Sequence, residues 1–375
     1  MSNNTIKHLK ENRDSEDHID KIYNFKMLWN SHCKKYNIDE QPNILPSVNR
    51  IIVLGDIHGD WEMTQRLLKI AKVVDDNGNW NGGDTVVVQV GDQIDRCRYG
   101  GAGSPSCEKK EATEPDEGND WIILKYFTKL HHQAKKFGGA VYSLMGNHEF
   151  MNVNGDFRYV SYEGRREFID YITPSGTQFA DGEEARRWAF QPGNPISDFL
   201  ACTRQLALVI GSNLFVHAGI VPIIAKKYNV SSLNKLMSLY LWDVLDKSSD
   251  YSDIFFRSEV SPMWNRIYGN IGIENIKNGI EDEASKDSID IQCNKILTPL
   301  KEIYKVDNIY VGHTPFMENG INSVCDNHIW LTDFGASKAF DKFDKSKASR
   351  NSRAETRKAQ VLEILKDGKV INILS

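Results

Sequence analysis

The 375-residue sequence contains no run of about 18 consecutive apolar residues, which is the length that a membrane-spanning helix needs. Residues 1–20 are polar and charged, and they lack the apolar centre of a secretory signal. Basic residues are not in excess, because the formal net charge is −5 and the pI is about 6.1. The sequence therefore predicts that neither membranes nor nucleic acids are partners of this protein.

Cysteine is also scarce, and the six cysteines are scattered without paired spacing: Cys33, Cys97, Cys107, Cys202, Cys293 and Cys325. This distribution is typical of a reducing compartment and not of a disulfide framework. We therefore expect free or buried thiols and a cytoplasmic location. Cys97 and Cys107 are the exception, since they enclose a short loop beside one of the motifs described below and could form an oxidation-sensitive pair.

Short apolar segments that end in polar clusters dominate the first half of the chain. The β-branched run Ile51–Leu54 leads directly into Asp56 and His58, which indicates a buried strand with polar residues at its carboxyl end. Thr85–Val90 and Ala140–Met145 are followed by similar clusters. Because strand, polar cluster and helix follow one another three times, the sequence predicts an α/β fold with a mostly parallel sheet covered by helices.

The remaining segments suggest the domain organisation. Residues 1–48 are expected to form a tail and a packing helix, residues 49–340 the main domain, and residues 341–375 a mobile linker and a closing hairpin. Within the main domain, residues 97–120 have the composition of an exposed loop and residues 150–200 that of a largely helical insertion.

Six polar residues at predicted strand ends are candidate metal ligands: Asp56, His58, Asp92, Asn147, His217 and His313. Two Asp, one Asn and three His are too many ligands for one metal ion with an open position. They suit two metal ions that share a bridging carboxylate. Because the donors are both nitrogen and oxygen, we expect two divalent transition metal ions, with Mn favoured and Fe or Zn as alternatives.

These motifs resemble the five ordered motifs of the PPP-type metallophosphatases in the calcineurin-like superfamily. They are Gly55-Asp56-x-His58-Gly59, Gly91-Asp92-x-x-Asp95-Arg96, Gly146-Asn147-His148-Glu149, His217-Ala218-Gly219 and Gly312-His313. Three further segments resemble the Shewanella-like branch: 82–85, 261–266 and 332–337. The resemblance covers residues 49–340. It implies central mixed β-sheets flanked by helices, with the helical insertion beside the active site.

The resemblance also implies a role for each metal ligand. Asp56 and His58 would hold the first metal ion, and Asp92 would bridge. Asn147, His217 and His313 would complete the second metal site. A water molecule between the two metal ions would be the nucleophile.

Four further residues receive catalytic roles from the same resemblance. Arg96 and Arg266 would bind the phosphate oxygens, although Arg257 is an alternative to Arg266. His148 would protonate the leaving oxygen, and Asp95 would orient its ring. Asp60 and Glu149 are expected to support the ligands through hydrogen bonds.

The leading functional hypothesis is a metal-dependent phosphoprotein phosphatase that hydrolyses phosphoserine, phosphothreonine or phosphotyrosine. Its partner would be a phosphorylated protein or peptide, and the motifs identify no regulatory subunit. The main alternative is a dinucleoside polyphosphate hydrolase of the same fold, which would bind a nucleotide. A phosphodiesterase is less favoured because Asp95-Arg96 belongs to the monoesterase pattern. A non-catalytic binding module is less favoured because no metal ligand is missing.

Overall fold

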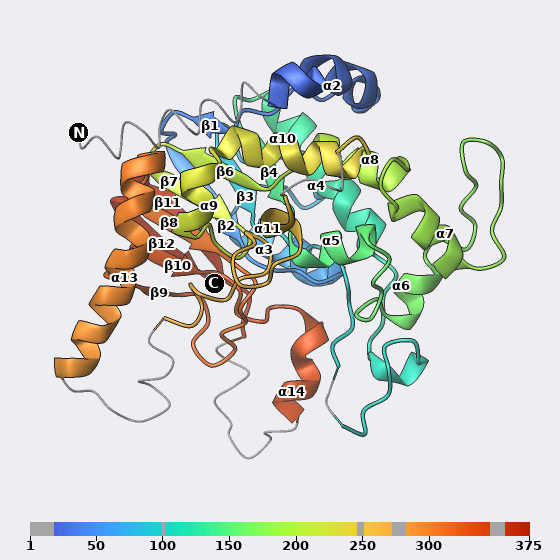
Figure 1. Ribbon diagram of the computed structural model, residues 1–375. Coiled ribbons are helices and arrows are strands. Elements are labelled where there is room, and N and C mark those ends of the chain that lie inside the picture. Colours follow the sequence, from blue (N-terminus) through green and yellow to red (C-terminus); the bar gives the residue numbers. More distant parts are fainter. Residues whose placement is uncertain (1–18, 100–101, 246–250, 272–282, 346–356) are drawn as a thin grey trace.

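The computed structural model describes residues 19–99, 102–245, 251–271, 283–345 and 357–375 (Figure 1). Two six-stranded sheets form its centre. The first has the order β1-β6-β7-β8-β10-β9: β1 Ile44–Leu45, β6 Ala207–Ile210, β7 Asn213–Val216, β8 Asn308–Val311, β10 Ile329–Leu331 and β9 Asn322–Val324. The second has the order β12-β11-β2-β3-β4-β5: β12 Val370–Leu374, β11 Val361–Leu365, β2 Arg50–Leu54, β3 Val86–Gln89, β4 Ala140–Leu144 and β5 Arg204–Gln205.

Both sheets are mixed, as the family resemblance implied. Strands β2, β3, β4 and β5 pair in parallel, whereas β11 joins β2 and β12 in antiparallel pairing. In the other sheet, β7, β8 and β10 are parallel, and β6 and β9 run antiparallel to their neighbours β7 and β10. One hydrophobic cluster contains residues of both sheets, such as Val87 and Phe215. The sheets therefore pack against each other through a shared core.

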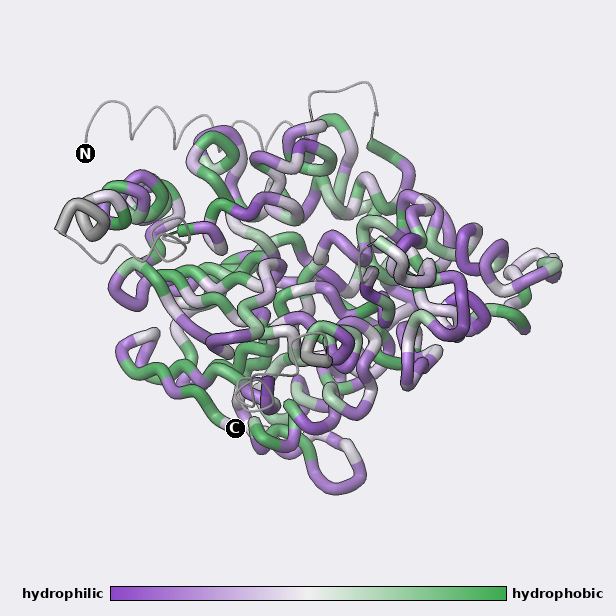
Figure 2. Tube along the Cα trace, turned by 90° about the horizontal axis from the view of Figure 1, so that it is seen from below, coloured by the Kyte–Doolittle hydropathy of each residue, from purple (hydrophilic) through white to green (hydrophobic). Residues whose placement is uncertain are grey.

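Helices surround the two sheets, and their bounds are α2 Phe25–Cys33, α3 Trp61–Ile70, α4 Asp120–Lys135, α5 Asn147–Val153, α6 Tyr162–Arg166, α7 Gly182–Phe190, α8 Pro195–Thr203, α9 Pro222–Lys227, α10 Val230–Leu241, α11 Ser252–Phe255, α13 Glu283–Tyr304 and α14 Asp341–Lys345. The insertion at 150–200 is largely helical, and α6 and α7 lie at one end of the molecule, away from the sheets (Figure 1). That end is mostly hydrophilic, whereas the strands are hydrophobic (Figure 2). In the described parts of the chain, no helix is both long enough and apolar enough to cross a membrane.

The prediction of free cysteine thiols was wrong. All six cysteines are paired, as Cys33–Cys202, Cys97–Cys107 and Cys293–Cys325. Two of the pairs join residues 169 and 32 positions apart, which sequence spacing cannot reveal because only the fold brings them together. Disulfides persist mainly in oxidising compartments. The cysteines therefore no longer support the cytoplasmic location, which remains a prediction.

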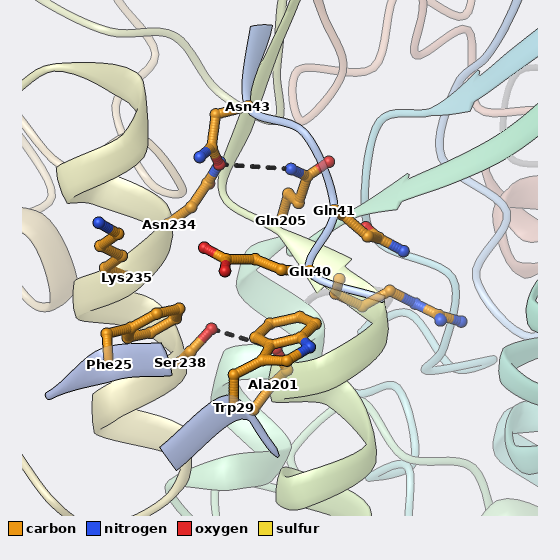
Figure 3. Close-up of a pocket in the computed structure, with 11 residues that line it drawn as sticks. Phe25, Trp29, Glu40, Gln41, Asn43, Ala201, Gln205, Asn234, Lys235 and Ser238 are labelled. Carbon is orange, nitrogen blue, oxygen red and sulfur yellow. Dashed lines mark hydrogen bonds between the residues drawn. The ribbon is translucent and has the colours of Figure 1, made fainter. Parts of the chain in front are cut away.

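The N-terminal helix α2 packs on α8 and α10, and a small cavity remains at this contact (Figure 3). Phe25 and Trp29 form one side of it. On the other side, the Asn43 side-chain oxygen accepts a hydrogen bond from Asn234 Nδ2 at 2.6 Å. The cavity volume is about 20 Å³, which is room for about one water molecule. This contact therefore anchors the N-terminal segment and is too small for a substrate.

His131 on α4 gives the fold a testable pH dependence. Burial, more than any other cause, lowers the pKa of this histidine from its usual 6.5 to about 4. The unfolded chain therefore binds a proton that the folded chain does not between about pH 6.5 and pH 4, so stability falls as the pH falls through this window. We expect His131→Gln to reduce this acid-induced loss of unfolding free energy by up to about 1.4 kcal/mol per pH unit. Denaturant unfolding at several pH values measures the effect.

The control for this prediction is His328→Gln, because His328 is less deeply buried than His131. This substitution should leave the acid slope of the wild type in place. An identical pH dependence in the wild type and His131→Gln would refute the prediction.

Candidate active site

The six predicted metal ligands converge where strands of both sheets end. Asp56 and His58 follow β2, Asp92 follows β3, and Asn147 is the first residue of α5 after β4. His217 and His313 come from the other sheet, after β7 and β8. All six side chains are buried. The site therefore lies where the carboxyl ends of parallel strands from the two packed sheets meet.

Asp92 lies at the centre of this group. Its oxygens are 3.3 Å from His217 Nε2 and 3.9 Å from His58 Nε2. Two sets of potential metal ligands contain it: Asp92 with His58 and His148, and Asp92 with His217 and His313. Because one carboxylate belongs to both sets, it is placed to bridge two metal ions.

The Asn147 side-chain oxygen lies within the second set. It is 3.0 Å from His217 Nε2 and 2.8 Å from His313 Nδ1. The Asn147 oxygen and the two histidine nitrogens are close enough, with Asp92 beside them, to bind one metal ion together.

Asp56 sits at the edge of the first set, and its carboxylate is 3.8 Å from His58 Nε2. It accepts a hydrogen bond from the His313 backbone N–H at 3.0 Å and also contacts Asp333. By distance alone, His148 completes the first set in place of Asp56. The assignment of Asp56 as a metal ligand therefore remains a prediction.

The three candidate ligand histidines share one arrangement, in which a backbone carbonyl fixes one ring nitrogen. The carbonyl oxygens that contact these ring nitrogens are Ile94 O for His58 at 3.2 Å, Val90 O for His217 at 2.9 Å, and Trp264 O for His313 at 3.0 Å. A nitrogen that donates to a carbonyl leaves the other nitrogen unprotonated and aimed at the centre. This is the usual support of a metal-binding histidine, so the residues present fit divalent metal ions.

The charges around His58, His313 and Asp92 agree with this fit, whereas burial of His217 is outweighed by attraction to Asp92, which raises the pKa of that ring. Burial, followed by repulsion from Arg98, lowers the pKa of His58 well below its ordinary value. Burial and the neighbouring His217 do the same for His313. Burial opposes ionisation of Asp92, but attraction to His217 and the other rings holds its pKa well below the ordinary value. Neutral imidazoles and an ionised carboxylate are the forms that bind metal ions.

The backbone is strained where these side chains are presented. His58, Asp92, Asp95 and His313 all have positive φ angles, between 48° and 73°. Non-glycine residues rarely adopt this conformation, and such strain is concentrated at functional sites. A Cβ atom at Gly146 would lie 2.1 Å from Asp92 Oδ1. The glycine in this motif is therefore required so that the chain can approach the ligand closely.

His148 differs from the ligand histidines because a carboxylate holds it. Its Nδ1 is 2.7 Å from Asp95 Oδ2. The other oxygen of Asp95 accepts a hydrogen bond from Asn152 Nδ2 at 2.9 Å, and Asn152 Oδ1 accepts one from Arg186 Nε at 2.8 Å. The fully buried Arg186 also pairs with Asp120 at 2.7 Å. An imidazole held in one orientation by a carboxylate is suited to proton transfer.

Of the two residues predicted to support the ligands, Glu149 does so directly, whereas Asp60 bonds to helix α3 and to Arg96. Glu149 accepts hydrogen bonds from the backbone N–H groups of Asp92 and Gly146, at 3.0 and 2.8 Å. Asp60 accepts one from the Met63 backbone N–H at 2.9 Å, which caps helix α3. It also pairs with Arg96 at 3.0 Å.

The three predicted arginines occupy different environments. Arg266 lines the cavity, and its Nη1 donates to His313 O at 3.0 Å. Arg257 is paired with Asp253 at the surface, which favours Arg266 over Arg257 as the phosphate ligand. Arg96 is fully buried and bonded to Asp60 and Ser337. It is not among the described residues that line the cavity, so its role as a phosphate ligand remains a prediction.

A cavity of about 610 Å³ opens onto the ligands, and its size is typical of a small-molecule site. Sequence reasoning missed Arg98, Tyr159 and Phe340 in its wall. Asp333, within the segment 332–337 that resembles the Shewanella-like branch, also lines the cavity. Arg98 follows the Asp92 motif by a few positions, and that proximity was the only available signal.

Metal binding offers a direct test of this geometry. We expect two Mn²⁺ ions per wild-type chain, about one in His313→Gln, and less than one in Asp92→Asn, because Asp92 belongs to both ligand sets. Elemental analysis of protein equilibrated with Mn²⁺ gives the stoichiometry. His131→Gln is the control, since His131 hydrogen-bonds to Val141 within the core and not to any ligand. An unchanged stoichiometry in Asp92→Asn would contradict the shared-ligand geometry.

Comparisons with known proteins agree with this site. A family model described as calcineurin-like phosphoesterase matches residues 49–317. An uncharacterised protein of Acanthamoeba polyphaga mimivirus is 37% identical over 262 residues, which cover 64% of this chain and 95% of that protein. Shewanella-like protein phosphatase 2 of Arabidopsis thaliana is 28% identical over 319 residues, covering 77% and 72% of the two chains.

Solved structures agree in fold. The crystal structure of a cold-active protein-tyrosine phosphatase from a psychrophilic Shewanella species superposes with a TM-score of 0.55. The match covers 89% of this chain and 83% of the other at 22% identity. The predicted resemblance to Shewanella-like phosphatases and the predicted fold are therefore both confirmed. With its metal-ligand geometry and a family match over most of its length, this chain belongs to the calcineurin-like phosphoesterase family.

Proposed function

We propose that this protein is a phosphoprotein phosphatase that hydrolyses phosphomonoesters with two divalent metal ions, Mn being favoured. The observation that supports this most strongly is the shared position of Asp92 in two sets of metal ligands. The similarity to proteins named Shewanella-like protein phosphatases supports the same conclusion.

Within this proposal, each residue of the chain has a defined task. Asp56, His58 and Asp92 would hold one metal ion, while Asp92, Asn147, His217 and His313 would hold the other. Bound metal ions would acidify water and stabilise negative charge on the phosphoryl oxygens. Arg266 would orient the phosphate group from the cavity wall.

His148 would donate a proton from Nε2 to the leaving oxygen, while Asp95 holds Nδ1 and so fixes the ring. Asn152 and Arg186 would keep Asp95 in place. The insertion helix α7, which carries Arg186, would thus support catalysis without touching the substrate.

The aromatic lining of the cavity favours an aryl phosphate, and hence phosphotyrosine. Tyr159, Trp264 and Phe340 line its wall beside the metal ligands. Aromatic side chains can pack against the ring of a tyrosyl ester, which a seryl ester lacks. One structural neighbour is described as a protein-tyrosine phosphatase, in line with this preference. We propose a phosphorylated protein or peptide as the partner.

A dinucleoside polyphosphate hydrolase is the second candidate, because the same aromatic wall can stack on a nucleotide base. A cytoplasmic location remains part of the sequence-based prediction, and the pairing of all six cysteines argues against it.

Hydrolysis of p-nitrophenyl phosphate with added Mn²⁺ tests the proposal. We expect turnover with Mn²⁺ that is lost when a chelator strips the metal and returns when Mn²⁺ is restored. Phosphotyrosine and phosphoserine peptides of one sequence then measure specificity, and the tyrosine form should have the higher kcat/KM. Diadenosine polyphosphates are the comparison substrates. No turnover by folded, metal-loaded protein would reject the phosphatase, and a preference for the dinucleotide would favour the second candidate.

The support of His148 by Asn152 can be tested by changing the leaving group. Asn152→Ala removes the hydrogen bond to Asp95, so we expect protonation of the leaving oxygen to be impaired. Phenyl phosphate has a poorer leaving group than p-nitrophenyl phosphate and needs this proton more. Its kcat should fall by about 10-fold or more, while that of p-nitrophenyl phosphate should change by about threefold or less.

Equal losses on the two substrates would show that Asn152 acts on folding or metal binding instead. Metal stoichiometry and thermal unfolding of Asn152→Ala separate these two explanations. Asn154→Ala is the control, because Asn154 lies near the end of the same helix but hydrogen-bonds to Tyr240 and not to Asp95.

A further inference from the structure

Arg98 is a buried arginine in the cavity wall that lies outside the metal-ligand and proton-donor groups. It is 9% exposed and lies in the loop after β3, two residues beyond Arg96. Its Nη1 donates to two backbone carbonyls, Asp95 O at 3.1 Å and Cys97 O at 2.8 Å. The N–H groups on Nε and Nη2 have no acceptor among the described residues. Part of the guanidinium is therefore fixed, and part remains available to a ligand.

Two aromatic rings hold this guanidinium in place. Its Cζ lies 5.5 Å from the centre of the Tyr159 ring and 4.9 Å from that of Phe340. Phe340 in turn packs against the ring of His58 at 5.7 Å. The loop is tied to the same wall, since the Cys97 backbone N–H donates to Tyr159 O at 3.0 Å. Stacking of this kind suits arginine, and it places a rigid cation beside a metal ligand.

The charge of Arg98 has no partner of its own. Within the described residues, no carboxylate forms an ion pair with it within 4.0 Å, although Asp92, Asp95, Asp333 and Asp56 attract it at longer range. His58 and Lys342 repel it. Metal ions bound by the ligand carboxylates would offset that attraction. A buried cation without a counter-ion is costly, so an anion bound in the cavity would stabilise it.

Arg96 presents the opposite case. It pairs with Asp60 at 3.0 Å and donates to Ser337 Oγ at 2.9 Å and to Pro115 O at 3.3 Å. Its charge is balanced inside the protein, and its side chain joins the loop at 97–120 to the start of α3.

We propose that Arg98, together with Arg266, binds the non-bridging oxygens of the substrate phosphoryl group, and that Arg96 instead supports the loop. This inference rests on the proposed phosphatase function and adds a residue that determines its substrate. A phosphomonoester carries two negative charges and three non-bridging oxygens, and two guanidinium groups on one cavity wall match that chemistry.

The test compares Arg98→Gln and Arg98→Lys with the wild type, all loaded with Mn²⁺. Calorimetric titration with inorganic phosphate measures the dissociation constant, and p-nitrophenyl phosphate hydrolysis measures KM. We expect Arg98→Gln to weaken both by about 10- to 100-fold, because a charge-assisted hydrogen bond is lost. Arg98→Lys should fall between Arg98→Gln and the wild type, since it keeps the charge but not the planar fork.

Arg158→Gln is the matched control. Arg158 lines the same cavity but pairs with Asp156 at 2.8 Å and is mostly exposed. The phosphate affinity of the Arg158→Gln protein should stay within about threefold of that of the wild type. Arg96→Gln should chiefly lower the thermal unfolding temperature, and it should weaken phosphate binding less than Arg98→Gln does.

Unchanged phosphate affinity and KM in an Arg98→Gln protein that binds Mn²⁺ normally would overturn the proposal. A larger loss of phosphate affinity in Arg96→Gln than in Arg98→Gln would overturn it as well. If Arg98→Gln does not fold, the same two criteria apply to Arg98→Lys. Failure of the phosphatase function is a separate result, because the wild type would then bind phosphate without hydrolysing any ester.

Discussion

The buried carboxylate of Asp92 is the constraint on which the rest of the site depends. It is almost fully shielded from water, and its oxygens lie near His217, His58 and His148. An ionised carboxylate is stable in such a place only where donors and positive charges surround it. The His148 backbone N–H supplies one donor, at 3.0 Å. Because these partners come from both sheets, the packing of the sheets and the chemistry of the site form a single arrangement.

The four histidines of the centre are distinguished by what holds their second nitrogen. Backbone carbonyls hold His58, His217 and His313, whereas a carboxylate holds His148. A carbonyl that accepts from one ring nitrogen aims the other nitrogen at a metal ion, while a carboxylate fixes the ring so that the other nitrogen can pass a proton. The same side chain thus serves two purposes, and the hydrogen-bond partner decides which.

The arginines follow a similar rule. Arg96 and Arg186 are fully buried, and each pairs with a carboxylate, so both stabilise the structure around the site. Arg98 and Arg266 line the cavity and use backbone carbonyls, which do not cancel their charge. The internal partner of a guanidinium therefore determines whether its charge is available to a phosphate group.

The sequence by itself determined the order of strands and polar clusters, and with it the six candidate ligands, while the family resemblance of its motifs added His148 and Asp95. Short β-branched runs followed by Asp and His place these polar residues at strand ends, and this local pattern does not depend on residues far away in sequence. Only the tertiary structure decided the features that depend on contacts far apart in sequence. It joined Cys33 to Cys202, brought Arg186 from the insertion to Asp95, and directed Arg98 instead of Arg96 into the cavity. Local patterns cannot reveal these pairings, because each arises from the packing of segments that the chain brings together only when it folds.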